Sequence, residues 1–342
     1  MSRRPTVSDV ADRAGVHRST AARALNPASS GMLSAQTVAR VQQAARELRY
    51  TTNSFARGLR TDRSLTVGVL VPDLMNPLFP PIVRGVQEAL FPHGYTALIA
   101  NTDNDPQRER AHFDALLSRQ VDGFIVATAR QSDAIIEKAQ RIGAALVLVN
   151  RSSAAPGFPL VTGDDRSGVR AAVEHLTELG HTRIGHLAGP AGVSTAQVRS
   201  SAFREVSRAL GLRPADTPVV GCEAFTEDGG LSGAHALLAA HPEVTAIVAA
   251  NDLIALGCLR AIARAGLRCP ADVSVVGYND MRFADAFSPA LTTVRVPHAL
   301  LGAEAASLLL DKISNPTSVS KTLLLPVELI VRDSTAVARP GR

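Results

Sequence analysis

The sequence predicts two kinds of fold in one chain: a small all-α head, followed by a larger α/β body with doubly wound parallel sheets. The chain has 342 residues, which is too long for one ordinary domain. Residues 1–63 hold eleven Arg against four acidic residues, a balance of +7, whereas the rest of the chain balances at −2. After residue 64, apolar strand segments alternate with helical segments, as in parallel sheets.

The composition narrows the class of protein. Hydrophobic residues make up 46% and charged residues 20%, as in a globular protein. No run of about 18 apolar residues occurs, and no apolar signal-peptide core follows the basic start, so we expect a cytoplasmic protein without a membrane span. Cys222, Cys258 and Cys269 have neither metal nor redox spacing. We expect them to be buried thiols, and we expect no metal and no cofactor.

Three short helical segments are predicted in the head. Thr6 can cap the first, and Asp9 lies three residues later, as in a capping box. Gly15 can adopt the positive φ of a tight turn, after which a second helical segment runs until Pro27 stops it. A third spans Ser34–Tyr50, with Ser34 as its cap. Two short helices joined by a glycine turn outline a helix-turn-helix.

The second helix is the element that we expect to enter the major groove of double-stranded DNA. Arg can bind guanine O6 and N7 with two hydrogen bonds, which favours Arg18 and Arg23 as base readers. The expected base-reading residues are His17, Arg18, Ser19 and Arg23. The expected phosphate contacts are Thr6, Thr20, Asn26, Ser34, Tyr50 and Asn53. On charge alone, a solvated basic face without a partner is an alternative, and for Thr6 and Ser34 so is capping alone.

Two motifs of the head match a known family. The first is Val7-x-Asp9-Val10-Ala11-x-x-Ala14-Gly15-Val16, and the second is Arg46-Glu47-Leu48-x-Tyr50-x-x-Asn53-Ser54-x-Ala56-Arg57-x-Leu59. They resemble the head of lactose-repressor-type (LacI family) bacterial transcription regulators. The resemblance implies a hinge helix that becomes ordered when two chains meet on DNA, with Ala56, Arg57 and Leu59 at the minor groove. An inserted leucine would unstack a base step, although Leu59 taken alone could be an ordinary buried residue.

The body is predicted as two sets of alternating strands and helices. In the first set, strands lie at 65–72, 95–100, 123–127 and 145–150, and helices at 80–90, 107–119 and 132–142. The second set begins near Val161, with helices at 166–179, 195–210, 227–240 and 253–265 and strands at 184–188, 218–222, 246–249 and 273–278. Ligands of such sheets bind beyond the carboxyl ends of the strands, so two facing lobes would form a cleft.

The resemblance extends over the body through three further motifs, Gly180–Pro190, Ala249–Gly257 and Val273–Asp280. It implies a periplasmic-binding-protein-like body with two lobes and three crossovers, near 161–163, 292–296 and 325–328. The expected domains are a helix-turn-helix domain (1–52), a hinge helix with linker (53–63) and an effector-binding and dimerisation domain (64–342). Within the last, the N-lobe spans about 64–161 plus 295–325, and the C-lobe about 162–292 plus 326–335.

The resemblance also implies an effector site between the lobes. By position, an apolar floor, an aromatic wall and a ligand-gripping arginine are expected. Asparagines at strand ends can donate to and accept from ligand hydroxyls. The expected effector-binding residues are Leu78, Phe79, Asn150, Arg199, Phe225, Asn251 and Asn279.

Four polar residues of the body motifs are considered individually, because a ligand-binding role and a structural role are both open to residues of these types. Asn279 stands where the family often has an aspartate, so the ligand could differ from that of relatives with a charged site. We expect Asp252 and Asp280 to cap the following helix or turn, and His181 to be structural.

The resulting hypothesis is a sequence-specific DNA-binding transcriptional regulator, a repressor, whose operator affinity is controlled by a small ligand, a sugar. A homodimer on a pseudo-palindromic operator is expected, because no leucine-heptad helix follows Thr335. The alternative is a solute-binding protein that presents a sugar to a transporter, which the body alone would fit. No nucleotide-binding glycine loop, zinc spacing or nucleophile elbow occurs, so we do not expect an enzyme.

Overall fold

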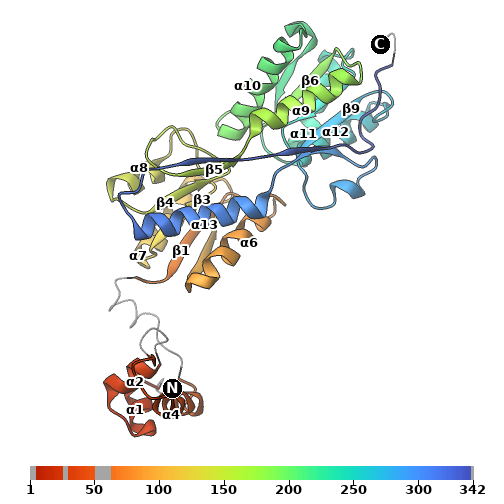
Figure 1. Ribbon diagram of the computed structural model, residues 1–342. Coiled ribbons are helices and arrows are strands. Elements are labelled where there is room, and N and C mark those ends of the chain that lie inside the picture. The colour runs from red at the N-terminus through yellow and green to blue at the C-terminus, as the bar shows by residue number, and fades with distance from the viewer. Residues whose placement is uncertain (1–4, 26–29, 51–62, 340–342) are drawn as a thin grey trace. The chain divides into compact units, whose positions relative to one another are not determined.

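The computed structural model describes residues 5–25, 30–50 and 63–339 (Figure 1). The chain divides into two compact units, residues 1–65 and 66–342, each considered by itself below. Among the described residues, no helix is both long enough and apolar enough to cross a membrane.

Three helices surround a small core in the described part of the head, as predicted. They are α1 (Val7–Ala14), α2 (Arg18–Ala24) and α4 (Ala35–Glu47). Both hydrogen bonds of the capping box between Thr6 and Asp9 are present, and Gly15 ends α1 at φ 62°. The core is made of small side chains, namely Val10, Ala11, Ala14, Ala21, Ala24, Val41, Ala44 and Ala45. An ion pair of 2.8 Å between Arg13 and Glu47 joins α1 to α4 at the surface.

The first lobe of the body is built on a wholly parallel six-stranded sheet of order β11-β5-β4-β3-β1-β2. Its strands are β1 (Thr66–Val71), β2 (Thr96–Asn101), β3 (Gly123–Val126), β4 (Leu146–Val149), β5 (Leu160–Gly163) and β11 (Thr322–Leu325). Its helices are α6 (Phe79–Leu90), α7 (Pro106–Ser118), α8 (Ala134–Arg141) and α13 (His298–Ser314), with the short η1 (Phe91–His93). β3 and β4 are buried throughout, as expected for strands covered on both faces.

The second lobe repeats this architecture with the order β12-β10-β9-β8-β6-β7, in which the pairing of β12 with β10 is antiparallel. Its strands are β6 (Ile184–Ala188), β7 (Val219–Gly221), β8 (Ala246–Ala249), β9 (Ser274–Asn279), β10 (Thr292–Arg295) and β12 (Glu328–Ile330). Its helices are α9 (Asp165–Glu178), α10 (Ser194–Ala209), α11 (Glu227–Ala240) and α12 (Asp252–Arg264), with the short η2 (Pro214–Asp216) and η3 (Ala284–Ala286). The predicted doubly wound α/β body is therefore confirmed.

The chain passes between the two sheets three times (Figure 1). It leaves the first sheet after β5 for α9, returns from β10 through α13, and leaves again from β11 to β12. These passages lie at or next to the crossovers expected from the resemblance. Of the six elements that they connect, only α9 was predicted as an element, whereas β5, β10, α13, β11 and β12 were not.

Candidate functional site

The residues that are expected to read DNA bases lie exposed on α2 and at its N-cap. His17, Arg18, Ser19 and Arg23 are all exposed, and Arg23 follows the first turn of α2 by one further turn. His17 has a second role that the sequence did not reveal, because its ring is the N-cap of α2. Its Nδ1 accepts from the backbone N–H of Ser19 at 3.3 Å, which leaves Nε2 as the ring nitrogen that can face a base.

Capping also occupies two of the expected phosphate contacts. The Thr6 hydroxyl lies 2.7 Å from Oδ2 of Asp9, and the Ser34 hydroxyl accepts from the backbone N–H of Thr37 at 3.2 Å. Thr20 and Tyr50 are half-buried, and Tyr50 packs against the core of the head. The remaining head and hinge predictions, Asn26, Asn53, Ala56, Arg57 and Leu59, lie outside the described residues.

The structure brings all seven expected effector-binding residues to one cavity between the lobes. Three further residues complete its lining, which consists of Asn76, Leu78, Phe79, Asn150, Arg151, Thr195, Arg199, Phe225, Asn251 and Asn279. The first sheet contributes the entry to α6 and the residues after β4, and the second contributes α10 and the ends of β8 and β9. The cavity volume is about 20 Å³, room for about one water molecule, so a larger ligand enters only if the walls move.

Arg199 is held rigidly in the wall of this cavity. Its Nε donates to Oδ1 of Asp165 at 2.9 Å, and its Nη1 donates to the carbonyl of Ala250 at 2.6 Å. The guanidinium carbon lies 3.8 Å from the ring centroid of Tyr278, a cation–π contact. These contacts orient the guanidinium and leave Nη2 as the nitrogen that can donate to a ligand.

The asparagines of the cavity differ in what they leave for a ligand. Oδ1 of Asn251 accepts from the backbone N–H of Ile254 at 2.8 Å and thereby caps α12, so its amide Nδ2 is the available group. Asn279 is buried at the end of β9 with φ 114°, and its Oδ1 has no hydrogen-bond partner. A buried acceptor without a partner is costly, so this position favours a ligand that donates a hydrogen bond.

Three lining residues were missed in the sequence. Arg151 directly follows the predicted Asn150, and the expectation that functional residues follow a strand end could have included it. Asn76 accepts from the backbone N–H of Leu78 at 3.1 Å and shapes the turn into α6. Thr195 lies in the first turn of α10, where no local sequence signal marks it.

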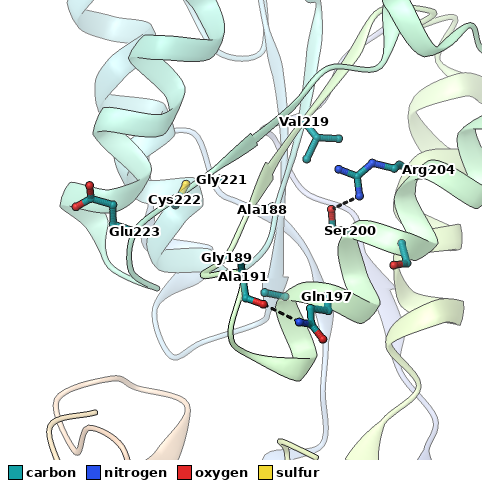
Figure 2. A pocket seen from close by; sticks show the side chains of 12 residues that line it. Ala188, Gly189, Ala191, Gln197, Ser200, Arg204, Val219, Gly221, Cys222 and Glu223 are labelled. Atoms are coloured by element: carbon teal, nitrogen blue, oxygen red, sulfur yellow. Dashed lines mark hydrogen bonds between the residues drawn. The ribbon is translucent and has the colours of Figure 1, made fainter. Parts of the chain in front are cut away.

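A larger, more open cavity of about 560 Å³ lies beside α10 and the edge strand β7 (Figure 2). Several of its polar side chains are engaged within the protein: Arg204 donates to the Ser200 hydroxyl at 3.0 Å, and Gln197 donates to the Ala191 carbonyl at 2.7 Å. Burial raises the pKa of the Cys222 thiol to about 11. The smaller cavity is the better candidate site because it combines aromatic walls with convergent polar groups.

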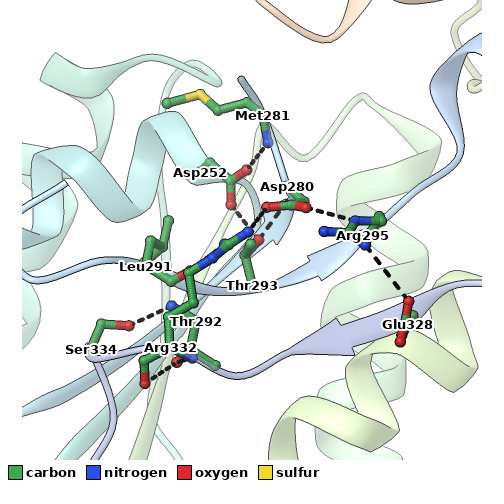
Figure 3. A network of polar contacts seen from close by, with 10 residues as sticks. All are labelled: Asp252, Asp280, Met281, Leu291, Thr292, Thr293, Arg295, Glu328, Arg332 and Ser334. Atoms are coloured by element: carbon green, nitrogen blue, oxygen red, sulfur yellow. Dashed lines mark hydrogen bonds and ion pairs between the residues drawn. The ribbon is translucent and has the colours of Figure 1, made fainter. Parts of the chain in front are cut away.

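Asp252 and Asp280 do not cap helices, contrary to part of the expectation, because Asn251 caps α12 instead. Asp252 is buried and accepts from the backbone N–H of Met281 at 2.7 Å and from the Thr293 hydroxyl at 2.5 Å (Figure 3). Asp280 forms ion pairs of 2.7 Å with Arg295 and with Arg332. Both carboxylates therefore connect the cavity asparagines that precede them to the segments that pass between the lobes.

His181 and two of the three cysteines are buried. The buried His181 ring lies 2.9 Å from the Thr245 hydroxyl and 3.1 Å from the Ser274 hydroxyl, and burial lowers its pKa. Cys222 and Cys258 are buried free thiols as expected, whereas Cys269 is only half-buried. No group of three or more His, Cys, Asp or Glu within the described ranges is arranged to hold a metal ion.

Both parts of the chain match known protein families. Residues 6–53 match the family described as bacterial regulatory proteins, lacI family. Residues 64–333 match periplasmic binding proteins and the sugar-binding domain of the LacI family. The ribose operon repressor of Halalkalibacterium halodurans is 33% identical over 330 residues, 96% of this chain and 97% of that protein.

Two solved structures extend the likeness to the fold. A lac repressor dimer bound to operator and to the anti-inducer ONPF is 29% identical with a TM-score of 0.87, covering 98% of this chain and all of the other. A complex of the transcriptional regulator CelR with cellobiose is 32% identical with a TM-score of 0.74, covering 97% and 100%. From its helix-turn-helix head to its two-lobed body, the chain belongs to the LacI family of bacterial regulatory proteins.

Proposed function

We propose that this chain is a repressor that binds operator DNA through α2 of its head and binds a small, sugar-like effector between the lobes of its body. The observation that carries the proposal is the convergence of Arg199, Asn251, Asn279 and the aromatic Phe225 on one cavity. Aromatic faces cover apolar faces of sugars, while amides and a guanidinium suit their hydroxyls. Relatives that are named ribose operon repressor or bind cellobiose support the ligand class.

The geometry also supports a mechanism for regulation. Because each lobe contributes a wall and the cavity has a volume of only about 20 Å³, a bound effector must change the separation or orientation of the lobes. The two lobes are covalently joined through the three passages, and Asp280, next to Asn279, is paired with Arg295 at the end of β10. Ligand binding thus alters the connection between lobes, and the effects of ligand and operator on each other must be reciprocal.

The chain would act by binding and not by catalysis. The ten residues that line the cavity offer amides, guanidiniums and a hydroxyl, and none of the ten carries a carboxyl, imidazole or thiol group. Such side chains are poor carriers of protons near neutral pH. We further propose a cytoplasmic homodimer on a pseudo-palindromic operator, in keeping with the dimeric lac repressor–operator structure that the chain resembles. A solute-binding protein is less favoured, since it would leave the basic head unused.

Selection of duplex DNA from a random library with the full chain tests the first half of the proposal. Enriched duplexes should be pseudo-palindromic, and fluorescence anisotropy then gives their affinity. Arg18→Ala should weaken binding about tenfold or more, since a bidentate arginine–guanine pair contributes about 1–3 kcal/mol. Arg119→Ala, which removes an exposed arginine of the body, is the matched control and should have no effect. Failure to enrich any duplex would overturn the proposed function.

A further inference from the structure

The lining of the effector cavity has an unusual balance of charge. Its ten residues contribute two guanidiniums and four carboxamides, and none of the ten brings a negative charge. The two arginines are both nearly fully buried, with Arg151 at 6% and Arg199 at 4% exposure. The environment of each guanidinium therefore decides what the cavity still needs from a ligand.

Arg199 is already neutralised by the protein. The carboxylate of Asp165 accepts from it at 2.9 Å, the Ala250 carbonyl accepts at 2.6 Å, and the ring of Tyr278 covers its face. A ligand that contacts Arg199 therefore does not need a negative charge to balance this guanidinium.

Arg151 is compensated much less, because no carboxylate of the described residues forms an ion pair with it. Within the described residues, the guanidinium of Arg151 donates one side-chain hydrogen bond, from Nη1 to Oδ1 of Asn104 at 3.3 Å. The acceptor is a neutral amide. Glu109 lies nearby, but its carboxylate pairs with Arg130 at 2.6 Å. Burial and the charge of Arg130 lower the pKa of Arg151 to about 10, an effect that the charge of Glu109 offsets only in part, and burial raises the pKa of Glu109. A buried guanidinium in this setting gains most from a negatively charged partner.

We propose that the effector is an anionic sugar, whose carboxylate or phosphate binds Arg151 and whose hydroxyl donates to Asn279. This inference rests on the proposed function and specifies its ligand. The planar fork of arginine matches both anions in a bidentate way. The unpartnered Oδ1 of Asn279 requires a donor, which an anion alone cannot supply. An inorganic anion could therefore pair only with Arg151, and a neutral sugar could donate only to Asn279.

Isothermal titration calorimetry of the full chain with matched pairs of neutral and anionic sugars tests the proposal. The phosphate arm compares ribose with ribose 5-phosphate and glucose with glucose 6-phosphate, and the carboxylate arm compares galactose with galacturonate. Inorganic phosphate serves as the control for an anion without hydroxyl groups. In at least one pair the anionic member should bind at least tenfold more tightly than the neutral one. If the neutral member equals or exceeds its partner in every pair, including pairs in which neither binds, the proposal is overturned.

Two substitutions separate charge from structure. Asn150→Asp adds a carboxylate beside Arg151 with little change in size, and should reduce the preference for the anionic member at least tenfold. Arg151→Gln should do the same by removing the positive charge, and it serves if Asn150→Asp does not fold. A merely structural role would weaken both members of a pair equally and leave their ratio unchanged. Arg119→Gln, on the exposed surface, is the matched control and should preserve the ratio.

The outcomes distinguish the two proposals. A neutral sugar that binds best and changes operator affinity would overturn the anionic ligand and leave the proposed function standing. A chain that enriches no duplex in DNA selection would remove the proposed function, whichever sugar binds.

Discussion

At the scale of single residues, two asparagines that line the cavity between the lobes are each followed in the sequence by an aspartate that does not line it. Asn251 and Asn279 line the cavity, while Asp252 and Asp280 bind the segments behind it. A Cβ on Gly277 would lie 2.3 Å from Oδ1 of Asp252, so only glycine leaves room for that carboxyl group. Asn279 itself has a positive φ of 114°, a strained conformation for a residue other than glycine.

Asp252→Asn should remove a pH dependence of stability. Burial raises the pKa of Asp252 to about 7, against the opposing effect of its hydrogen bonds from Thr293 and Met281. Because the folded pKa exceeds that of the unfolded chain, the stabilisation is complete below about pH 4 and is lost as the pH rises through about 7. Between about pH 4 and pH 7, the free energy of unfolding of the variant should increase by up to about 4 kcal/mol relative to that of the wild type.

Melting temperatures measured by circular dichroism between pH 4 and pH 8 check this prediction. The difference between variant and wild type should shift in favour of the variant as the pH rises and level off above about pH 7. A difference that stays constant over this range would contradict the raised pKa of Asp252.

At the scale of elements, two glycines allow α6 and α13 to pack in close contact. A Cβ on Gly85 would lie 1.9 Å from the carbonyl oxygen of Ala299, and one on Gly302 would lie 2.0 Å from that of Ile82. In both cases the nearest atom is a backbone oxygen, so a change of side-chain rotamer could not remove the steric clash. The pair α6–α13 therefore depends on both glycines, and α13 is the element through which the chain returns to the first lobe.

Gly302→Ala should destabilise the body by about 3 kcal/mol or more, at the upper end of overpacking costs, because the helices must move apart. Gly192→Ala is the matched control: a Cβ there meets nothing within 4 Å, and the φ of Gly192 is not positive. Urea unfolding followed by far-ultraviolet circular dichroism measures both. Equal midpoints for Gly302→Ala and the wild type would show that α6 and α13 can separate without cost.

At the scale of the whole molecule, the sequence predicted the alternating elements well and the returning ones poorly. Strands such as β4 are continuous apolar runs, and helices such as α1 carry caps, so local patterns reveal both. β11 and β12 are short, partly exposed strands whose pairing partners lie far away in sequence. The position of Arg151 after a strand end could have been recognised in the sequence, whereas its burial to 6% exposure depends on the assembled cavity.

The distribution of charge yields a last prediction about the whole molecule. The balance of +7 lies in residues 1–63, whereas the remainder balances at −2, so attraction to DNA should come from the head. Contacts to phosphates release counterions, and 6–10 such contacts would lower affinity about 10³-fold or more between about 50 and 200 mM salt. Fluorescence anisotropy with the selected operator over this range should show that steep decrease.

Charge substitutions can then assign the salt dependence to one unit. Arg40 lies exposed on α4 of the head and Arg119 lies exposed on the body. If the head supplies the attraction, Arg40→Glu should weaken operator binding most at low salt, because long-range repulsion from phosphates is least screened there. Arg119→Glu, the same change of charge on the body, should leave both affinity and salt slope unchanged. Equal effects of the two substitutions would show that operator binding follows the net charge of the chain and not the charge of its head.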